Sequence, residues 1–110
     1  MEKLGFTAIN YITCKDHYKE RFEELIKNRA GMIDNNKGFR NMHVLRPNKN
    51  DDEYLIISYW DTEEDFINWT KSESFIKGHA RGFADLKAAK ERGEEAPMSS
   101  SFKTYDIITN

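Results

Sequence analysis

The chain has 110 residues, 17 basic and 19 acidic side chains, and a single cysteine. This length predicts one domain, spanning residues 1–110, with one modest core. The nearly balanced charge excludes the basic surface typical of nucleic-acid-binding proteins. The lone Cys14 excludes an internal disulfide, and we interpret it as a small apolar filler near the end of a strand.

The sequence at the N-terminus, MEKLGFTAIN, lacks the basic start, apolar middle and small-residue cleavage site of a secretory signal peptide. No apolar run approaches the ~20 residues that a membrane-spanning helix needs. Together with the cysteine usage, these features predict a cytoplasmic protein without a membrane or nucleic-acid partner.

Residues 5–13 (GFTAINYIT) alternate in a way that predicts a strand with Phe6, Ala8, Asn10 and Ile12 on one face. Asn10 is the polar exception on that face. A buried amide without a partner costs about 1–3 kcal/mol. A backbone carbonyl or water satisfies the amide in one interpretation, and a bound ligand does so in the other.

A helix over residues 16–30 is expected next, capped by Asp16 and ended by Gly31. Its apolar stripe comprises Tyr18, Phe22, Leu25, Ile26 and Arg29. Residues 38–47 (GFRNMHVLRP) and 53–60 (EYLIISYW) predict two strands that form an antiparallel hairpin across a polar turn.

Two helical segments follow the hairpin. Asp61 or Thr62 is expected to cap the first. Ser72 or Ser74 is expected to cap the second, which runs to about Arg92.

The polar segment 92–101 (RGEEAPMSSS) predicts a loop, and residues 101–109 (SFKTYDIIT) predict a closing strand. The resulting order, β-α-β-β-α-α-β, predicts an α+β fold. It has a ferredoxin-like antiparallel sheet with its helices on one face. The strand over residues 54–60 is apolar on both faces. We therefore expect a second copy to cover the open face, giving a homodimer.

Several chemistries are excluded by the spacing of the side chains they need. His17, His43 and His79 are too far apart in sequence for a zinc-binding pattern, and there is no H-E-x-x-H motif. No nucleophile elbow or phosphate-binding glycine loop is present.

The segment around His79 carries the strongest functional signal. Gly78 inside a helix costs about 1 kcal/mol relative to alanine, and Gly82 follows one turn later. The two glycines predict a flat helix surface that admits either a planar ligand or another helix. His79 by itself is more typical of an ordinary helix histidine than of a ligand-binding one.

Trp69 precedes His79 by ten positions (79 − 69 = 10). On one straight helix this separation is about 15 Å of rise, so only a large flat ligand would contact both side chains. A break at residues 71–74 would instead let the two side chains converge on a small ligand.

The spacing W-x-K-S-x-x-F-x-x-x-H, formed by Trp69, Lys71, Ser72, Phe75 and His79, resembles the haem-degrading monooxygenases of the IsdG-like type. These belong to the antibiotic-biosynthesis-monooxygenase-like superfamily of dimeric α+β barrels. The resemblance extends along the chain to Asn10, Gly38, Phe39, Trp60 and the TYDI sequence at residues 104–107.

The resemblance implies that His79 is the axial ligand to the iron of haem. It places Asn10 on the opposite side of the ring, as a hydrogen-bond donor to bound oxygen or to the attacked part of the ring. Trp69 would press on the macrocycle and distort it. Phe75, Gly78 and Gly82 would complete the haem-binding surface.

Such enzymes open the haem ring with O₂ and electrons from a reductase or small reductant, releasing iron and an open-chain tetrapyrrole. Lys77 and Arg81 beside His79 are either propionate partners or solvated cations. Other superfamily members oxidise polycyclic aromatic substrates without a cofactor. That activity, and haem binding without turnover, are the two alternative functions.

Overall fold

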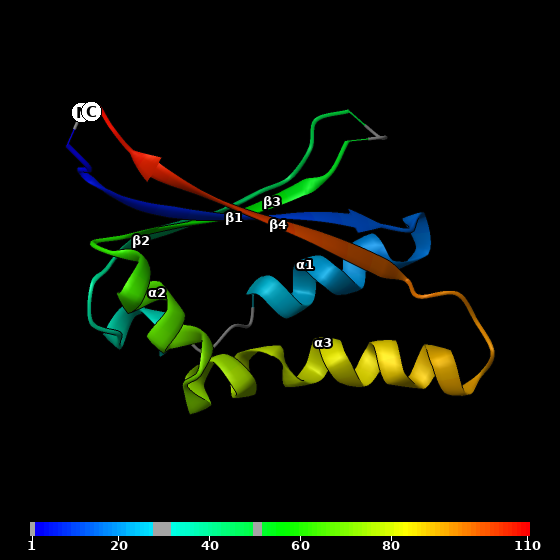
Figure 1. Cartoon of the computed structure of the whole chain (residues 1–110). Helices are drawn as coiled ribbons and strands as arrows, with labels where there is room; N and C mark the ends of the chain where they lie inside the picture. Colours follow the sequence, from blue (N-terminus) through cyan, green and yellow to red (C-terminus); the bar gives the residue numbers. More distant parts are fainter. Residues whose placement is uncertain (1, 28–31, 50–51) are drawn as a thin grey trace.

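The computed structural model describes residues 2–27, 32–49 and 52–110. In chain order its elements are β1 (Gly5–Cys14), η1 (Asp16–Tyr18), α1 (Lys19–Lys27), η2 (Met32–Asn35), β2 (Phe39–Leu45), β3 (Tyr54–Trp60), α2 (Glu63–Thr70), α3 (Glu73–Glu91) and β4 (Met98–Ile107) (Figure 1). None of the helices in these described ranges is long and apolar enough to cross a membrane.

The four strands form one antiparallel sheet in the order β2-β3-β1-β4. Figure 1 shows α1, α2 and α3 all lying against the same face of this sheet. The predicted α+β, ferredoxin-like fold is therefore confirmed. Phe6, Ala8 and Ile12 of β1 are buried beneath the helices, so the predicted inward face of this strand is also correct.

Side-chain hydroxyls start the two C-terminal helices where the sequence predicted. Thr62 has an extended backbone, and its hydroxyl accepts a hydrogen bond from the Asp65 amide at 3.1 Å. Ser72 does the same for the Phe75 amide at 3.2 Å. Each cap satisfies one of the amides that a helix leaves without an internal partner. The cap at Ser72 therefore starts a new helix, and α2 and α3 are separate.

Two sequence predictions were wrong. Asp16 does not cap α1 but lies inside η1, where its carboxylate pairs with Lys19 at 3.0 Å. The closing strand begins at Met98 rather than at Ser101, because β1 extends to Cys14 and supplies hydrogen-bonding partners for the serines. The predicted end of the first helix, at residues 28–31, lies outside the described residues.

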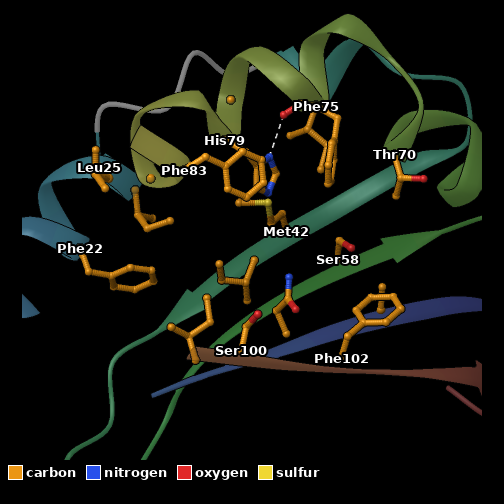
Figure 2. Close-up of a pocket in the computed structure, with 18 of the residues that line it drawn as sticks. Phe22, Leu25, Met42, Ser58, Thr70, Phe75, His79, Phe83, Ser100 and Phe102 are labelled. Atoms are coloured by element: carbon orange, nitrogen blue, oxygen red, sulfur yellow. Dashed lines mark hydrogen bonds between the residues drawn. The ribbon is translucent and has the colours of Figure 1, made fainter. Parts of the chain in front are cut away.

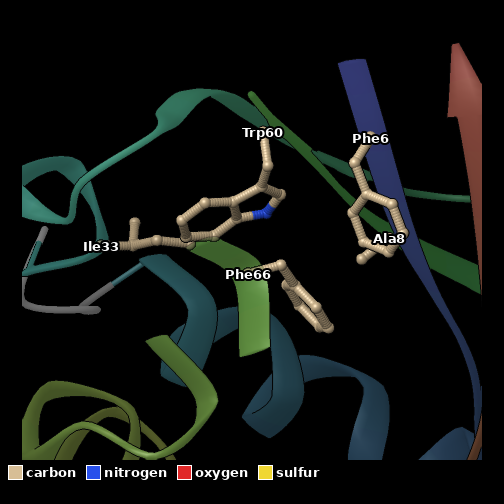
Figure 3. Close-up of a cluster of buried hydrophobic side chains, with 5 residues drawn as sticks. All are labelled: Phe6, Ala8, Ile33, Trp60 and Phe66. Atoms are coloured by element: carbon tan, nitrogen blue, oxygen red, sulfur yellow. The ribbon is translucent and has the colours of Figure 1, made fainter. Parts of the chain in front are cut away.

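The core consists of two clusters of buried side chains. The tryptophan cluster comprises Phe6, Ala8, Ile33, Trp60 and Phe66, and Figure 3 shows these side chains converging between β1, β3 and α2. The tyrosine cluster comprises Ile12, Tyr18, Phe22 and Tyr54, towards the other end of β1. Trp60 is fully buried, and its ring lies within 6 Å of the rings of Phe39, Phe66 and Trp69.

Candidate active site

A cavity of about 590 Å³ lies between the sheet and the helices. The four strands form its floor, α2 and α3 form its roof, and α1 closes one side (Figure 2). Its lining is mainly apolar, with a few polar side chains. Such a cavity has the size and composition expected of a site for a small organic ligand or cofactor.

His79 of α3 lines this cavity and is half-buried. Its Nδ1 lies 2.7 Å from the backbone carbonyl oxygen of Phe75, one helical turn earlier. Because a carbonyl only accepts hydrogen bonds, Nδ1 carries the proton, and a neutral ring then keeps its lone pair on Nε2. Figure 2 shows this second nitrogen directed into the cavity. His79 is therefore prepared to ligate a metal ion or accept a proton there.

Two phenylalanines fix the plane of the His79 ring. Phe75 stacks on it with ring centres 4.0 Å apart, and Phe83 stacks at 5.7 Å on the far side. The three rings follow one another at intervals of four residues along one face of α3. Phe83 was not among the predicted site residues, although its spacing from His79 was visible in the sequence.

Trp69 lies at the end of α2, with its ring centre 6.4 Å from that of His79. The helix break between them therefore brings the two side chains together, as the second of the two interpretations required. Trp69 also packs against Trp60 and Phe75, at 5.7 and 4.9 Å. Its indole nitrogen is buried and has no hydrogen-bond partner among the described residues, so packing alone orients the ring.

Asn10 lies on the floor of the cavity, in the middle of β1 and facing the helices. Its side-chain amide makes no hydrogen bond to another protein group in the described ranges, and the residue is half-buried. The sequence allowed a backbone carbonyl as the partner of this amide, and no such hydrogen bond is observed in the described ranges. Water or a ligand in the cavity remains as the partner of this amide.

Gly78 and Gly82 both line the roof of the cavity. A methyl group added at Gly78 would meet no described atom within 4 Å, and one at Gly82 would only touch Met98 at 3.8 Å. Within the described ranges no other helix packs against Gly78, so the surface beside this glycine is open.

A hydrogen-bonded group fixes the far end of α3. Asp85 accepts from the Tyr18 hydroxyl at 2.7 Å and from Arg21 Nε at 2.9 Å. The Arg21 hydrogen bond is the main cause of a lowered pKa at Asp85, and burial is the main cause of a raised pKa at Tyr18.

Arg81 lines the cavity one turn before Asp85, whereas Lys77 is exposed outside it.

Comparison with known proteins places this geometry in a family. Residues 5–81 match the antibiotic biosynthesis monooxygenase family. The chain therefore belongs to that family.

Among curated relatives, a heme oxygenase (staphylobilin-producing) of Staphylococcus haemolyticus is 31% identical over 99 residues, covering 87% of this chain and 88% of that protein. A heme oxygenase (mycobilin-producing) of Mycobacterium tuberculosis is 31% identical over 77 residues, covering 70% and 72%. These relatives confirm the resemblance to haem-degrading monooxygenases, and with it the prediction of an enzyme that is an O₂-using oxidoreductase.

Solved structures show the same fold. The heme-degrader MhuD of Mycobacterium tuberculosis, with two hemes bound in its active site, aligns with a TM-score of 0.70, covering 96% of this chain and 97% of that one at 22% identity. SnoaB of Streptomyces nogalater, a cofactor-independent oxygenase, aligns with a TM-score of 0.69, covering 96% of this chain and 95% of that one at 18% identity. At these identities the likeness establishes the fold, not the reaction.

The residues of the cavity fit a haem group. The imidazole of His79 presents an unprotonated nitrogen, which is a common axial donor to haem iron. Gly78 leaves open space beside it, and apolar side chains line most of the remaining surface. No cluster of three or more His, Cys, Asp or Glu side chains that could hold a metal ion occurs among the described residues. A metal held by His79 alone would need a macrocycle to supply its other ligands.

Proposed function

We propose that this protein is a haem-degrading monooxygenase that binds haem in the cavity beneath α3 and opens the porphyrin ring. The products are iron and an open-chain tetrapyrrole. Bound haem supplies both the iron that activates O₂ and the ring that is attacked, with electrons from a reductase or small reductant. The supporting observation is that His79, Trp69 and Asn10 line one cavity from three different elements.

Each of the three residues is proposed to have one role. His79 Nε2 would hold the iron, because Nδ1 is already bound to the Phe75 carbonyl. Trp69 would press on the macrocycle, with its own ring held by packing against Trp60 and Phe75. Asn10 donates a hydrogen bond from the floor, where its amide has no protein partner in the described ranges. Phe75, Gly78 and Gly82 complete the surface for the macrocycle.

The test is a hemin titration followed by addition of a reductant in air. We expect stoichiometric binding with a Soret band, then loss of that band and release of chelatable iron. His79→Ala should change the spectrum and slow bleaching. His17→Ala, at an exposed histidine outside the cavity, is the matched control. Bleaching of His79→Ala at the wild-type rate with an unchanged spectrum would show that His79 is not the ligand.

The same titration separates the alternatives. A cofactor-independent oxygenase of the SnoaB kind, acting here on an aromatic substrate, would bind hemin weakly and without a defined stoichiometry. A haem-binding module without turnover would keep its Soret band under reducing, aerated conditions.

A homodimer is the second part of the proposal. The face of the sheet that points away from the helices carries Leu55, Ile57 and Tyr59 from β3, with Ile9 and Tyr11 beside them on β1. Paired apolar side chains of this kind are rarely left in contact with water. We expect a second copy to cover these side chains. Light scattering should therefore give the mass of a dimer for the wild type and of a monomer for Ile57→Lys.

A cytoplasmic location remains a prediction from the sequence.

A further inference from the structure

The sheet contributes three polar side chains to the cavity, and they lie on one diagonal. Ser58 comes from β3, Asn10 from β1 and Ser100 from β4. In the register of the strands, Ser58 is opposite Ala8, while Ser100 is opposite Ile12. Asn10 therefore lies between them, one diagonal step from each. Diagonal neighbours on one face of a sheet are about 7–8 Å apart, a span that one water molecule bridges.

Ser58 is the inner end of this diagonal. It is buried, and its Oγ accepts a hydrogen bond from Trp60 Nε1 at 2.9 Å. A hydroxyl has one donor and two acceptor positions. Since the indole uses one acceptor position, the hydroxyl proton of Ser58 stays available for a partner in the cavity that Ser58 lines.

Ser100 is the outer end. β4 is an edge strand of the sheet, and Ser100 is exposed while still lining the cavity. Neither Ser100 nor Asn10 makes a side-chain hydrogen bond to protein in the described part of the chain. Apolar residues surround the diagonal on both sides, including Ile12, Ile56 and Phe102. Among the described side chains of the sheet, only those on the diagonal therefore offer polar partners to water on this floor.

We propose that Ser58, Asn10 and Ser100 hold a line of water molecules across the cavity floor, open to solvent at Ser100, and that this line supplies the protons which ring opening consumes. The role of the line as a proton supply rests on the proposed function. A monooxygenase puts one oxygen atom into its substrate and reduces the other to water, which takes up protons together with the donated electrons.

The proton transfer leaves every side chain with its original charge. The Ser100 hydroxyl passes its proton to the inner water and takes another from the water on its solvent side. Ser58 holds the inner end of the line through its bond to Trp60. Asn10 holds the line at its centre through its amide and does not itself change protonation. Ser58 and Ser100 are thus positioning and relay residues.

The first test uses the haem-free protein and needs no activity. A crystal structure at high resolution should show ordered water within hydrogen-bonding distance, about 3 Å, of each of the three side chains. Ser100→Ala should lose the outer water, while Ser99→Ala should keep it, because Ser99 alternates to the other face of β4. A dry floor in the wild-type protein would overturn the proposal, even if haem degradation were established.

The second test follows Soret bleaching in H₂O and D₂O. We expect Ser100→Ala to bleach about tenfold more slowly, since solvent only partly replaces a positioned proton donor. Its solvent isotope effect should be larger, at unchanged hemin affinity. Ser100→Thr keeps the hydroxyl and should recover both values, and Ser99→Ala should match the wild type. Equal rates and isotope effects for Ser100→Ala and Ser99→Ala would refute the relay. If no variant bleaches, the proposed function fails, and the crystal structures still decide whether the water line exists.

Discussion

The two core clusters on either side of the cavity are stabilised in different ways. The tryptophan cluster is aromatic and aliphatic, and Trp60 Nε1 donates a hydrogen bond to the neighbouring Ser58. The tyrosine cluster has ionised groups at its edge: Tyr54 donates to Glu23 at 2.6 Å, and Tyr18 donates to Asp85 at 2.7 Å. Trp69 depends on the first cluster for its position, whereas α1 and the far end of α3 depend on the second.

This difference separates two kinds of support around the cavity. The wall that holds Trp69 is built from close-packed rings, which resist displacement and do not respond to pH. The wall that joins the helices to each other and to the sheet uses charge pairs, which fix direction but depend on ionisation. Four substitutions test that separation, from the largest expected effect to the smallest.

Trp60→Ala should break the tryptophan cluster. Removing a fully buried aromatic side chain leaves a large cavity, and we expect a loss of about 3–5 kcal/mol in unfolding free energy. Urea unfolding measures it, with Ile76→Ala as the control, because Ile76 is 61% exposed on α3. A loss below about 1 kcal/mol would mean that this cluster is not the main support of the fold.

Ser58→Ala tests the hydrogen bond that Trp60 of the same cluster donates to Ser58. It leaves the buried Trp60 N–H without an acceptor, which should cost about 1–3 kcal/mol. Ser58→Thr keeps the hydroxyl and should lose less. Equal stability of wild type and Ser58→Ala in the same urea experiment would show that the indole finds another partner.

Gly78→Ala changes the roof of the cavity and leaves both core clusters unaltered. A methyl group there meets no described atom within 4 Å, so the haem-free protein should become more stable by up to about 1 kcal/mol. Hemin affinity should fall, because the methyl group occupies the space beside His79. Thermal unfolding and a hemin titration give the two values. A gain in stability without loss of affinity would place the ligand elsewhere.

Glu23→Gln tests the charged edge of the tyrosine cluster. Hydrogen bonds from Arg46 and then Tyr54 lower the pKa of Glu23 to about 2. Because the folded pKa lies below the usual value of about 4.3, Glu23 stabilises the fold above that usual value, and this stabilisation is lost as the pH falls towards 2. The variant should therefore show a weaker dependence of stability on pH between about 4.5 and 2. The control is Glu20→Gln, at an exposed site on α1, which should keep the wild-type dependence of stability on pH. The same wild-type dependence in Glu23→Gln would show that the charge pair does not stabilise the fold.

The sequence predicted those features that rest on local chemistry. Thr62 and Ser72 start helices because a hydroxyl before an amphipathic run is a local signal, and Asn10 was placed on the correct face by alternation alone. The start of β4 was missed because three serines have no strand preference of their own. Pairing with β1 determines their conformation.

The features that depend on strand register were not predictable. Ser58 and Ser100 are 42 residues apart in sequence (100 − 58 = 42), and only the pairing of both strands with β1 places them beside Asn10. The distance from Trp69 to His79 was likewise open until the angle between α2 and α3 was known. Phe83 was missed because its spacing of four residues from His79 shows only a shared helix face, and not that this face lines a cavity.

The Ser72 side chain lies where α2 meets α3. Its hydroxyl donates to the Trp69 carbonyl at 2.6 Å while it accepts from the Phe75 amide at 3.2 Å, so the same side chain contacts the end of α2 and the start of α3. His79 lies on α3, so a rotation of α3 about Ser72 would move His79. Small rotations at Ser72 would change the gap between indole and imidazole while leaving both helices whole. A substitution at Ser72 would therefore change the spacing of Trp69 and His79 without altering either of these two side chains.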